Sequence, residues 1–163
     1  MQALDQAELT SADVLFMALR DLEVFPSVDS FEARRRIQKL GYILQKCGIL
    51  PSYGYSWYLQ GPYSPELTDD LYTVSTNFVQ FMTRNSGRNF VPDARERLEK
   101  VKRILGPSMS NTQVLEAIAS ILYLGPGWEG KLSALKPGLP TESIEQARLV
   151  IQELETQNLL ELG

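Results

Sequence analysis

The sequence predicts a mostly α-helical protein with a few short strands, arranged as winged-helix-like halves packed as one globular unit. Apolar residues recur at helical spacing through most of the 163 residues, and capping residues bound these segments. Strand signals are confined to "YGYSWYL" and the terminal "NLLEL". The order helix, helix, strand describes residues 11–64, and a similar order describes residues 111–162, as in a winged helix-turn-helix. We therefore expect an N-terminal part at 1–106 and an acidic C-terminal part at 107–163.

The first two helices are predicted by their capping residues. Thr10 or Ser11 begins a helix whose apolar residues follow helical spacing. Asp29 and Glu32 form a capping box for a second helix, which is expected to run to Gly48.

The strand "YGYSWYL" follows, and Ser64 with Pro65 then begins a third helix, as a cap followed by a first-turn proline. The apolar stripe of this helix predicts that it continues to near Gly87. Three further long helices and one short helix, "GKLSALK", are predicted by signals of the same kind. Their expected first residues are Asp93, Ser110, Gly130 for the short helix, and Thr141.

Composition and charge limit the class of function. The chain has 16 basic and 20 acidic residues, and its net charge of −4 gives no overall attraction to nucleic acid or to an anionic membrane. The excess lies in residues 111–163, which hold three basic and seven acidic side chains. The single cysteine forms no internal disulfide, and no apolar run reaches the roughly 20 residues that span a bilayer. We therefore expect a soluble, cytoplasmic protein with no membrane partner.

Several common chemistries are excluded or disfavoured. The chain contains no histidine, which excludes Ser-His, Cys-His and His-metal arrangements. Cys47 lies on the apolar face of the second helix and is interpreted as a small core side chain. Glu66, Asp69 and Asp70 could bind Mg²⁺ or act as an acid–base pair, but acids are favoured in the first turns of a helix without any such function. We predict no catalytic residue, no metal site and no cofactor.

The second helix also carries a basic face. Its members Arg35, Lys39, Tyr42 and Lys46 lie together, opposite the apolar face that contains Ile37. Three cations around an exposed tyrosine form a candidate face for nucleic acid or an acidic partner, and the alternative is a solvated polar face. A second basic zone spans residues 84–103. The last helix is acidic, so we do not expect it to enter a DNA groove.

Two stretches, "RRRIQKLGYILQKCGI" and "YSWYLQGPYSPELTDDLYTV", form a specific pattern: a basic helix with a Gln-Lys pair, an aromatic strand, and Gly-Pro-Tyr-Ser before a further helix. This pattern resembles the uncharacterised bacterial and archaeal YwgA-like proteins, with a fainter similarity to the SocA-like (Panacea) antitoxin and proteolysis-adaptor domains. The matching residues are Arg34, Gln38, Lys39, Tyr42, Leu44, Gln45, Gly61, Pro62, Tyr63, Ser64, Leu67, Asp70 and Leu71. Gln60 stands where the pattern often has an aromatic residue. The resemblance implies no known enzymatic activity.

The stretch "YSWYLQGPYSPEL" is predicted to be a rigid strand-to-helix corner with an aromatic surface. Gly61 and Pro62 are expected to make the turn. The aromatic residues of the corner are Tyr53, Tyr55, Trp57, Tyr58 and Tyr63. Alternation along the strand places the first three on one face and the fourth on the other. Because aromatic residues with a polar tip are favoured at interfaces, these five residues are the candidate protein-interaction surface.

Together these observations predict a non-catalytic prokaryotic binding or regulatory module rather than an enzyme. Its partner is expected to be a protein, either a toxin or effector or a second copy of the chain, in the manner of an antitoxin or adaptor. The alternative is a DNA-binding winged-helix transcriptional regulator that uses the basic face of the second helix. A metal-dependent enzyme built on the carboxylates at 66–70 is a third and less favoured hypothesis.

Overall fold

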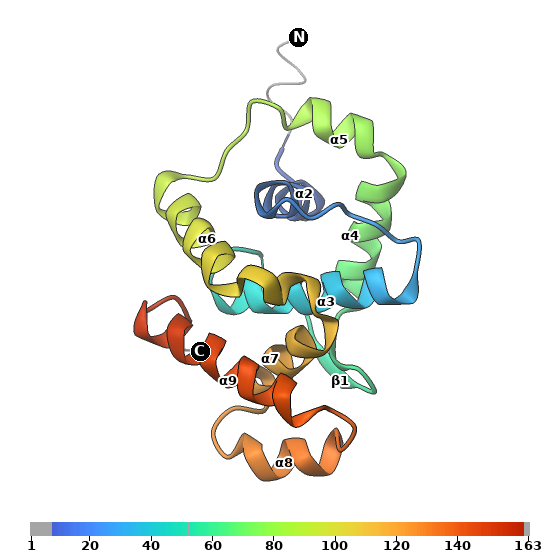
Figure 1. The fold of residues 1–163 in the computed structure, drawn as a ribbon. Helices are drawn as coiled ribbons and strands as arrows, with labels where there is room; N and C mark the ends of the chain where they lie inside the picture. The colour runs from blue at the N-terminus through green and yellow to red at the C-terminus, as the bar shows by residue number, and fades with distance from the viewer. Residues whose placement is uncertain (1–7, 52, 162–163) are drawn as a thin grey trace.

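The computed structural model describes residues 8–51 and 53–161 of the chain. Within these ranges the protein is mostly helical with one two-stranded sheet, which confirms the predicted fold class (Figure 1). The elements in chain order are α2 (Ser11–Leu22), α3 (Phe31–Lys46), β1 (Ser56–Tyr58), β2 (Gly61–Tyr63), α4 (Pro65–Thr76), α5 (Phe78–Arg84), α6 (Pro92–Leu105), the 3₁₀ helix η1 (Gly106–Ser110), α7 (Thr112–Leu124), α8 (Trp128–Leu135) and α9 (Thr141–Thr156). None of the described helices combines the length and the apolar character needed to cross a membrane.

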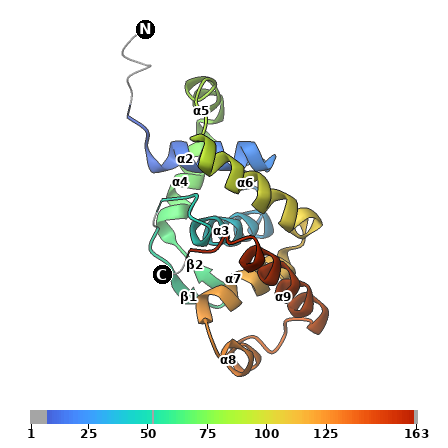
Figure 2. The same cartoon turned by 90° about the vertical axis from the view of Figure 1, so that its left-hand side faces the viewer.

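Helix α3 lies at the centre of the molecule. In Figure 1, α2, α4, α5 and α6 lie on one side of it and α7, α8 and α9 on the other, and the turned view of Figure 2 shows the same two groups. One apolar core joins them, through residues such as Leu44 of α3, Leu115 of α7 and Leu154 of α9, all of which are fully buried. Burying one such leucine contributes about 1.5 to 3 kcal/mol. The two parts of the chain therefore share a single core.

Among the described helices, α2, α3, α4 and α7 begin at a side-chain cap, and two of these caps differ by one residue from the prediction. α6 begins at Pro92 rather than Asp93 and α8 at Trp128 rather than Gly130, and neither has a side-chain cap. Thr10 caps α2, as expected. Ser30 rather than Asp29 caps α3, and Asn111 rather than Ser110 caps α7. In both cases the side-chain oxygen accepts a hydrogen bond from the backbone N–H three residues on, at 3.0 and 3.1 Å.

The third predicted helix is in fact two helices, α4 and α5. They meet at Asn77, whose side-chain amide donates a 2.9 Å hydrogen bond to the carbonyl oxygen of Thr73. The break lets α5 turn toward α2, where Phe81 packs on Phe16 with ring centroids 6.2 Å apart. These rings belong to a second, smaller apolar cluster beside the main core. A single apolar stripe through both helices was therefore the wrong interpretation.

The two strands form an antiparallel hairpin with Leu59 and Gln60 in its turn. Tyr58 lies opposite Gly61. The prediction that Gly61 and Pro62 form the turn into the next helix is wrong, because they belong to β2 and the turn precedes them. Gly61 does have a positive φ of 92°, which suits the residue that follows a tight turn.

The strand expected at "NLLEL" is not formed by the described residues 158–161. Asn158, with a positive φ of 58°, redirects the chain after α9, and Leu159 is buried in the core. The backbone N–H of Glu161 then donates a 2.7 Å hydrogen bond to the carbonyl oxygen of Lys46 at the end of α3. A helix–helix–hairpin order is present in the N-terminal part, whereas the described C-terminal part has no wing, so that half of the winged-helix prediction is wrong.

Candidate functional site

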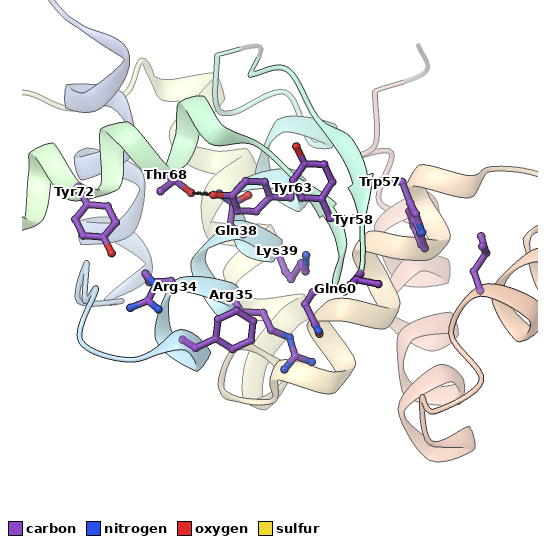
Figure 3. A pocket seen from close by; sticks show the side chains of 13 residues that line it. Arg34, Arg35, Gln38, Lys39, Trp57, Tyr58, Gln60, Tyr63, Thr68 and Tyr72 are labelled. Atoms are coloured by element: carbon purple, nitrogen blue, oxygen red, sulfur yellow. Dashed lines mark hydrogen bonds between the residues drawn. The ribbon is translucent and has the colours of Figure 1, made fainter.

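A groove of about 980 Å³ lies between α3, α4 and the hairpin (Figure 3). Its lining combines five aromatic side chains, three cations and a few polar or aliphatic side chains. The lining residues are Phe31, Arg34, Arg35, Gln38, Lys39, Trp57, Tyr58, Leu59, Gln60, Tyr63, Thr68, Tyr72 and Leu135. Helix α3 supplies one wall, the hairpin the opposite wall, and Leu135 at the end of α8 closes one side.

The aromatic rings of the groove are held in place by their neighbours. Tyr58 stacks on Tyr63 with centroids 5.0 Å apart and planes 19° from parallel. The hydroxyl of Tyr63 accepts a 2.9 Å hydrogen bond from Thr68 of α4. Tyr58 is nevertheless 49% exposed, and Tyr72 on α4 is also exposed. The groove thus presents rigid, accessible aromatic surface.

Lys39 lies at the base of the groove and is only 1% exposed. Its ammonium group donates a 2.8 Å hydrogen bond to the carbonyl oxygen of Pro62 in β2. Burial lowers the pKa of Lys39 to about 8; the negative charge of Glu116 raises it, while the positive charges of Lys136 and Arg35 lower it further.

Glu116 of α7 forms ion pairs with two of the cations near Lys39. Its carboxylate, with a side chain only 3% exposed, forms ion pairs with Arg35 of α3 and with Lys136, which follows α8. Lys136 also donates to the carbonyl oxygen of Leu59 in the hairpin turn. The hairpin is therefore tied through charged groups to both parts of the chain. Within the described residues, Arg35 Nε is buried without a hydrogen-bond partner.

Two glutamines of α3 hold the aromatic segment by its backbone. Gln38 donates to the carbonyl oxygen of Ser64 at 2.8 Å and accepts from the Ser64 N–H at 2.9 Å. Gln45 makes the same pair of contacts with Tyr53, at 3.1 and 2.8 Å. Each amide satisfies one donor and one acceptor of a segment outside regular structure.

Sequence reasoning identified neither Glu116 nor the roles of the two glutamines. A signal for Glu116 was available, since it is the single charged residue in the apolar helix "TQVLEAIASILYL". Lone charges in such a context are usually buried and paired. Gln38 and Gln45 are seven residues apart, which places them two turns apart on one helix face.

The structure separates the five residues of the candidate protein-interaction surface. Trp57, Tyr58 and Tyr63 line the groove. Tyr53 is buried and its hydroxyl donates a 2.6 Å hydrogen bond to Asp70, while Tyr55 packs edge-on against Tyr42 with centroids 4.8 Å apart. A single exposed face shared by Tyr53, Tyr55 and Trp57 is therefore the wrong interpretation. The loop before β1 packs onto α3 instead of continuing the strand.

The basic face of α3 is not the exposed face that the helical wheel predicts. Lys39 is buried, Tyr42 is 5% exposed, and Arg35 is paired with Glu116. Burial also raises the pKa of Tyr42, and the nearby Tyr123 adds to the effect. Lys46 lies over the Tyr42 ring, 5.7 Å from its centroid.

The hairpin and α7 cover this side of α3, which a two-dimensional wheel cannot represent. The four residues together therefore do not form a phosphate-binding surface. The nucleic-acid alternative stays a prediction, but it loses the contacts on which it was based.

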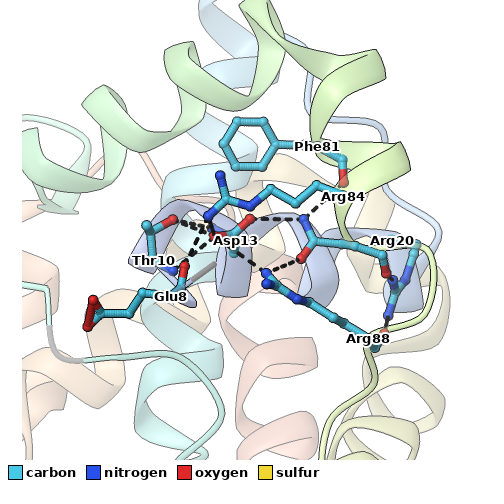
Figure 4. Close-up of polar contacts among 8 residues, drawn as sticks. Glu8, Thr10, Asp13, Arg20, Phe81, Arg84 and Arg88 are labelled. Atoms are coloured by element: carbon cyan, nitrogen blue, oxygen red, sulfur yellow. Dashed lines mark hydrogen bonds and ion pairs between the residues drawn. The ribbon is translucent and has the colours of Figure 1, made fainter. Parts of the chain in front are cut away.

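The second basic zone, residues 84–103, supports the fold. Figure 4 shows Arg84 beside the buried carboxylate of Asp13, with an N–O distance of 2.6 Å, and Arg88 at 3.8 Å from the same oxygen. Arg97 donates to the carbonyl oxygens of Cys47 and Leu159, which joins α6 to the ends of two other elements. These arginines connect distant segments.

Two of the three carboxylates considered for metal binding, those of Asp70 and Glu66, accept hydrogen bonds from other segments of the protein. Asp70 accepts from Ser11 and from Tyr53, both at 2.6 Å, and Glu66 accepts from the Gly54 N–H at 2.7 Å. In residues 8–51 and 53–161, no three acidic or cysteine side chains come together as a metal site would require.

Cys47 is fully buried, as expected, and burial is the main cause that raises the pKa of its thiol to about 12. This places it in the core and away from the groove.

The fold and the groove define a mostly α-helical protein with an aromatic groove above a cluster of buried charges. Comparisons with protein-family models, with curated proteins and with solved structures give no match.

Proposed function

We propose that this protein is a non-catalytic binding module that recognises a segment of a partner protein in the groove between α3, α4 and the hairpin. The resemblance at residues 34–74 adds an antitoxin-like or adaptor-like role in a prokaryotic cytoplasm. The observation that carries the proposal is the groove, an open hollow of about 980 Å³ lined by five aromatic side chains.

The polar groups around the groove favour binding over catalysis because they already hold the fold together. Lys39 donates to Pro62, Gln38 to Ser64, and Arg35 to Glu116. A side chain that joins two elements in this way cannot leave its partner without a cost to stability. The groove thus offers contact area around structural polar groups.

The aromatic lining suits a polypeptide partner. Tyrosine and tryptophan dominate the binding energy of many protein interfaces, because they bury a large area and keep a polar tip. Tyr58 is already held by stacking on Tyr63, so it loses little side-chain entropy when it is covered. The groove extends from Tyr72 on α4 to Trp57 on the hairpin, which gives an extended segment several places to make contact (Figure 3).

Selection of a displayed library of random linear peptides on the wild-type protein tests the proposal. The selected peptides are then measured by fluorescence polarisation against the double variant Tyr58→Ala, Tyr72→Ala. We expect affinity to fall about tenfold or more, since tyrosine is enriched among the hot-spot residues whose truncation costs about 2 kcal/mol or more.

The matched control is the double variant Phe25→Ala, Leu149→Ala, which removes two exposed apolar side chains outside the groove. It should bind the selected peptides like the wild type, and circular dichroism should show both variants folded. Peptides that bind the groove variant and the wild type equally well would place the binding surface elsewhere and overturn the proposal.

A further inference from the structure

The charges along the groove are of one sign. Among the described residues that line it, the side chains charged at neutral pH are Arg34, Arg35 and Lys39, and none is a carboxylate. All three come from α3, and Figure 3 shows Arg35 and Lys39 between Arg34 and the hairpin. A segment that enters the groove therefore meets positive charge along one wall.

The protein compensates this charge incompletely. The carboxylate of Glu116 pairs with both Arg35 and Lys136. Lys39 is left with the neutral carbonyl oxygen of Pro62 as its hydrogen-bond partner. Arg35, Lys39 and Lys136 together with the single carboxylate of Glu116 therefore leave an excess of positive charge. This place is poorly solvated, so electrostatic interactions there are stronger than in water.

Arg34 adds a cation that retains donor capacity. One terminal nitrogen of its guanidinium group donates a 2.7 Å hydrogen bond to the carbonyl oxygen of Val28. No ion pair joins Arg34 to a carboxylate in the part of the chain that the structure describes. A guanidinium group has five N–H donors, so the remaining donors can bind a carboxylate, in the geometry that arginine favours.

Taken with the aromatic rings, this arrangement selects for particular chemistry in the partner. Apolar or aromatic side chains would pack on Tyr58, Tyr63 and Tyr72, while a negative group would lie against the α3 wall. A basic segment would add like charge to a cluster that already has too much of it, which costs free energy and excludes such partners.

We infer that the occupant of the groove is an acidic segment of a partner protein, with an aspartate or glutamate carboxylate bound by Arg34 and an apolar side chain packed on the tyrosines. This inference rests on the proposed function and adds the chemistry of the partner. Charge complementarity with the α3 wall, together with the excess positive charge beneath it, supports this choice over a neutral or basic segment.

Burial is the main cause that lowers the pKa of Lys39, and the positive charges of Lys136 and Arg35 act in the same direction, against the carboxylate of Glu116. The charged groups that face it are Arg35 on its own helix, Glu116 on α7 and Lys136 after α8. A carboxylate bound nearby would add negative charge and raise the pKa of Lys39. Binding of an acidic peptide above about pH 8 should therefore be accompanied by proton uptake.

The composition of the selected peptide pool tests the inference directly. The random linear library is selected in parallel on the wild type, on Arg34→Glu and on Arg95→Glu, and each pool is sequenced. Arg95 is an exposed cation on α6 and serves as the matched control for charge reversal. We expect enrichment of Asp and Glu over Lys and Arg on the wild type and on the control, and loss or reversal of that enrichment on Arg34→Glu.

A chosen wild-type peptide and its Glu→Gln or Asp→Asn analogue give the magnitude. The neutral analogue should bind about tenfold or more weakly to the wild type, as expected for loss of one charge-assisted hydrogen bond. The two peptides should bind Arg34→Gln with similar affinity. Raising the salt concentration should weaken the acidic peptide more than its analogue.

The outcomes separate the inference from the proposed function. Peptides that bind in the groove without acidic enrichment, or with the same composition on Arg34→Glu, would overturn the inference and leave the proposed function standing. Peptides that bind outside the groove would overturn both. An acidic pool that depends on Arg34 and on the groove tyrosines supports both.

Discussion

The ammonium group of Lys39 donates a 2.8 Å hydrogen bond to the carbonyl oxygen of Pro62, so a buried cation of α3 holds the second strand of the hairpin. This contact joins the helix at the centre of the molecule to one wall of the groove. It also brings a charge into the interior, where its protonation depends on the fold.

The free energy of unfolding should depend on pH through Lys39. Its pKa is about 8 in the folded protein against an ordinary value of 10.5, so between these values the unfolded chain holds more protons. Stability contributed by this group therefore rises with pH across that window. We expect the unfolding free energy of the wild type, minus that of Lys39→Met, to increase by about 1 to 2 kcal/mol from about pH 7.5 to about pH 9.5.

Urea unfolding of the two proteins at each pH measures this difference. Tyrosines and the cysteine titrate in both proteins, so their effects largely cancel in the subtraction. A difference that stays constant or decreases with pH would show that Lys39 is not held with a lowered pKa.

Loss of the Glu116 carboxylate should destabilise the fold strongly. Glu116→Gln leaves Arg35, Lys39 and Lys136 without a negative neighbour in a buried place. We expect a loss of about 3 to 5 kcal/mol in urea unfolding, the range for removal of one partner of a buried pair. The control Glu129→Gln removes an exposed carboxylate that lies 3.9 Å from Arg148, and it should change stability by less than about 1 kcal/mol.

A double-mutant cycle tests whether Glu116 stabilises the fold through its pair with Arg35. If Arg35→Met costs much less in the Glu116→Gln background than in the wild type, the pair itself stabilises the fold. If Arg35→Met lowers the unfolding free energy equally in both backgrounds, the two residues act independently, which would contradict the ion pair.

Acid should weaken the fold through Asp13. Burial raises the pKa of this carboxyl group, but hydrogen bonds from Thr10 and Asn85 together with the charge of Arg84 outweigh it, and the net pKa is lowered. A carboxylate with a lowered folded pKa stabilises above its unfolded pKa, and that stability is lost as pH falls through the folded value. We expect Asp13→Asn to cost about 2 to 4 kcal/mol near pH 7, and the cost to shrink below about pH 4.

Thermal and urea unfolding between about pH 3 and pH 7 measure this effect. Asp93→Asn is the matched control, since Asp93 is an exposed carboxylate in the first turn of α6. Its loss should cost less than about 1 kcal/mol. A cost for Asp13→Asn that does not change with pH would contradict the lowered pKa.

Glycine is required at position 61 for two reasons. Its φ is 92°, and a Cβ added there would lie 2.9 Å from Ser120 Oγ on α7. We expect Gly61→Ala to cost about 1 to 3 kcal/mol. Gly130→Ala, within the exposed helix α8 with no atom within 4 Å of the added Cβ, should instead stabilise by about 0.5 to 1 kcal/mol. Melting temperatures that move in the same direction for both variants would contradict this account.

Local signals in the sequence predicted the helices well. Thr10 and Ser64 cap the helices expected, and Cys47 is the core residue that its helical position indicated. Caps and apolar spacing depend on residues within a turn or two of one another, so a single sequence contains most of the information. The errors at Ser30 and Asn111 are of one residue, because neighbouring polar residues compete for the same cap.

The candidate site was predicted less completely. Three of the five aromatic residues proposed as an interaction surface, Trp57, Tyr58 and Tyr63, do line the groove. Of the proposed basic face, Arg35 and Lys39 line it too, but Arg35 is partly buried and paired with Glu116, and Lys39 is buried and bonded to Pro62. A helical wheel considers one helix alone and places its charged residues in solvent. It cannot show that the hairpin packs over those residues.

The sequence by itself determined that the chain is mostly helical, roughly where most of its helices begin, and that an aromatic segment follows the second of them. Only the tertiary structure decided that Lys39 is buried, that Glu116 faces it from α7, and that the groove lies between α3 and the hairpin. The physical reason is the separation along the chain of the residues that interact. Helix caps and periodicity arise from interactions within a few residues, whereas burial of a charge depends on which distant segments pack around it and on the partner that they supply.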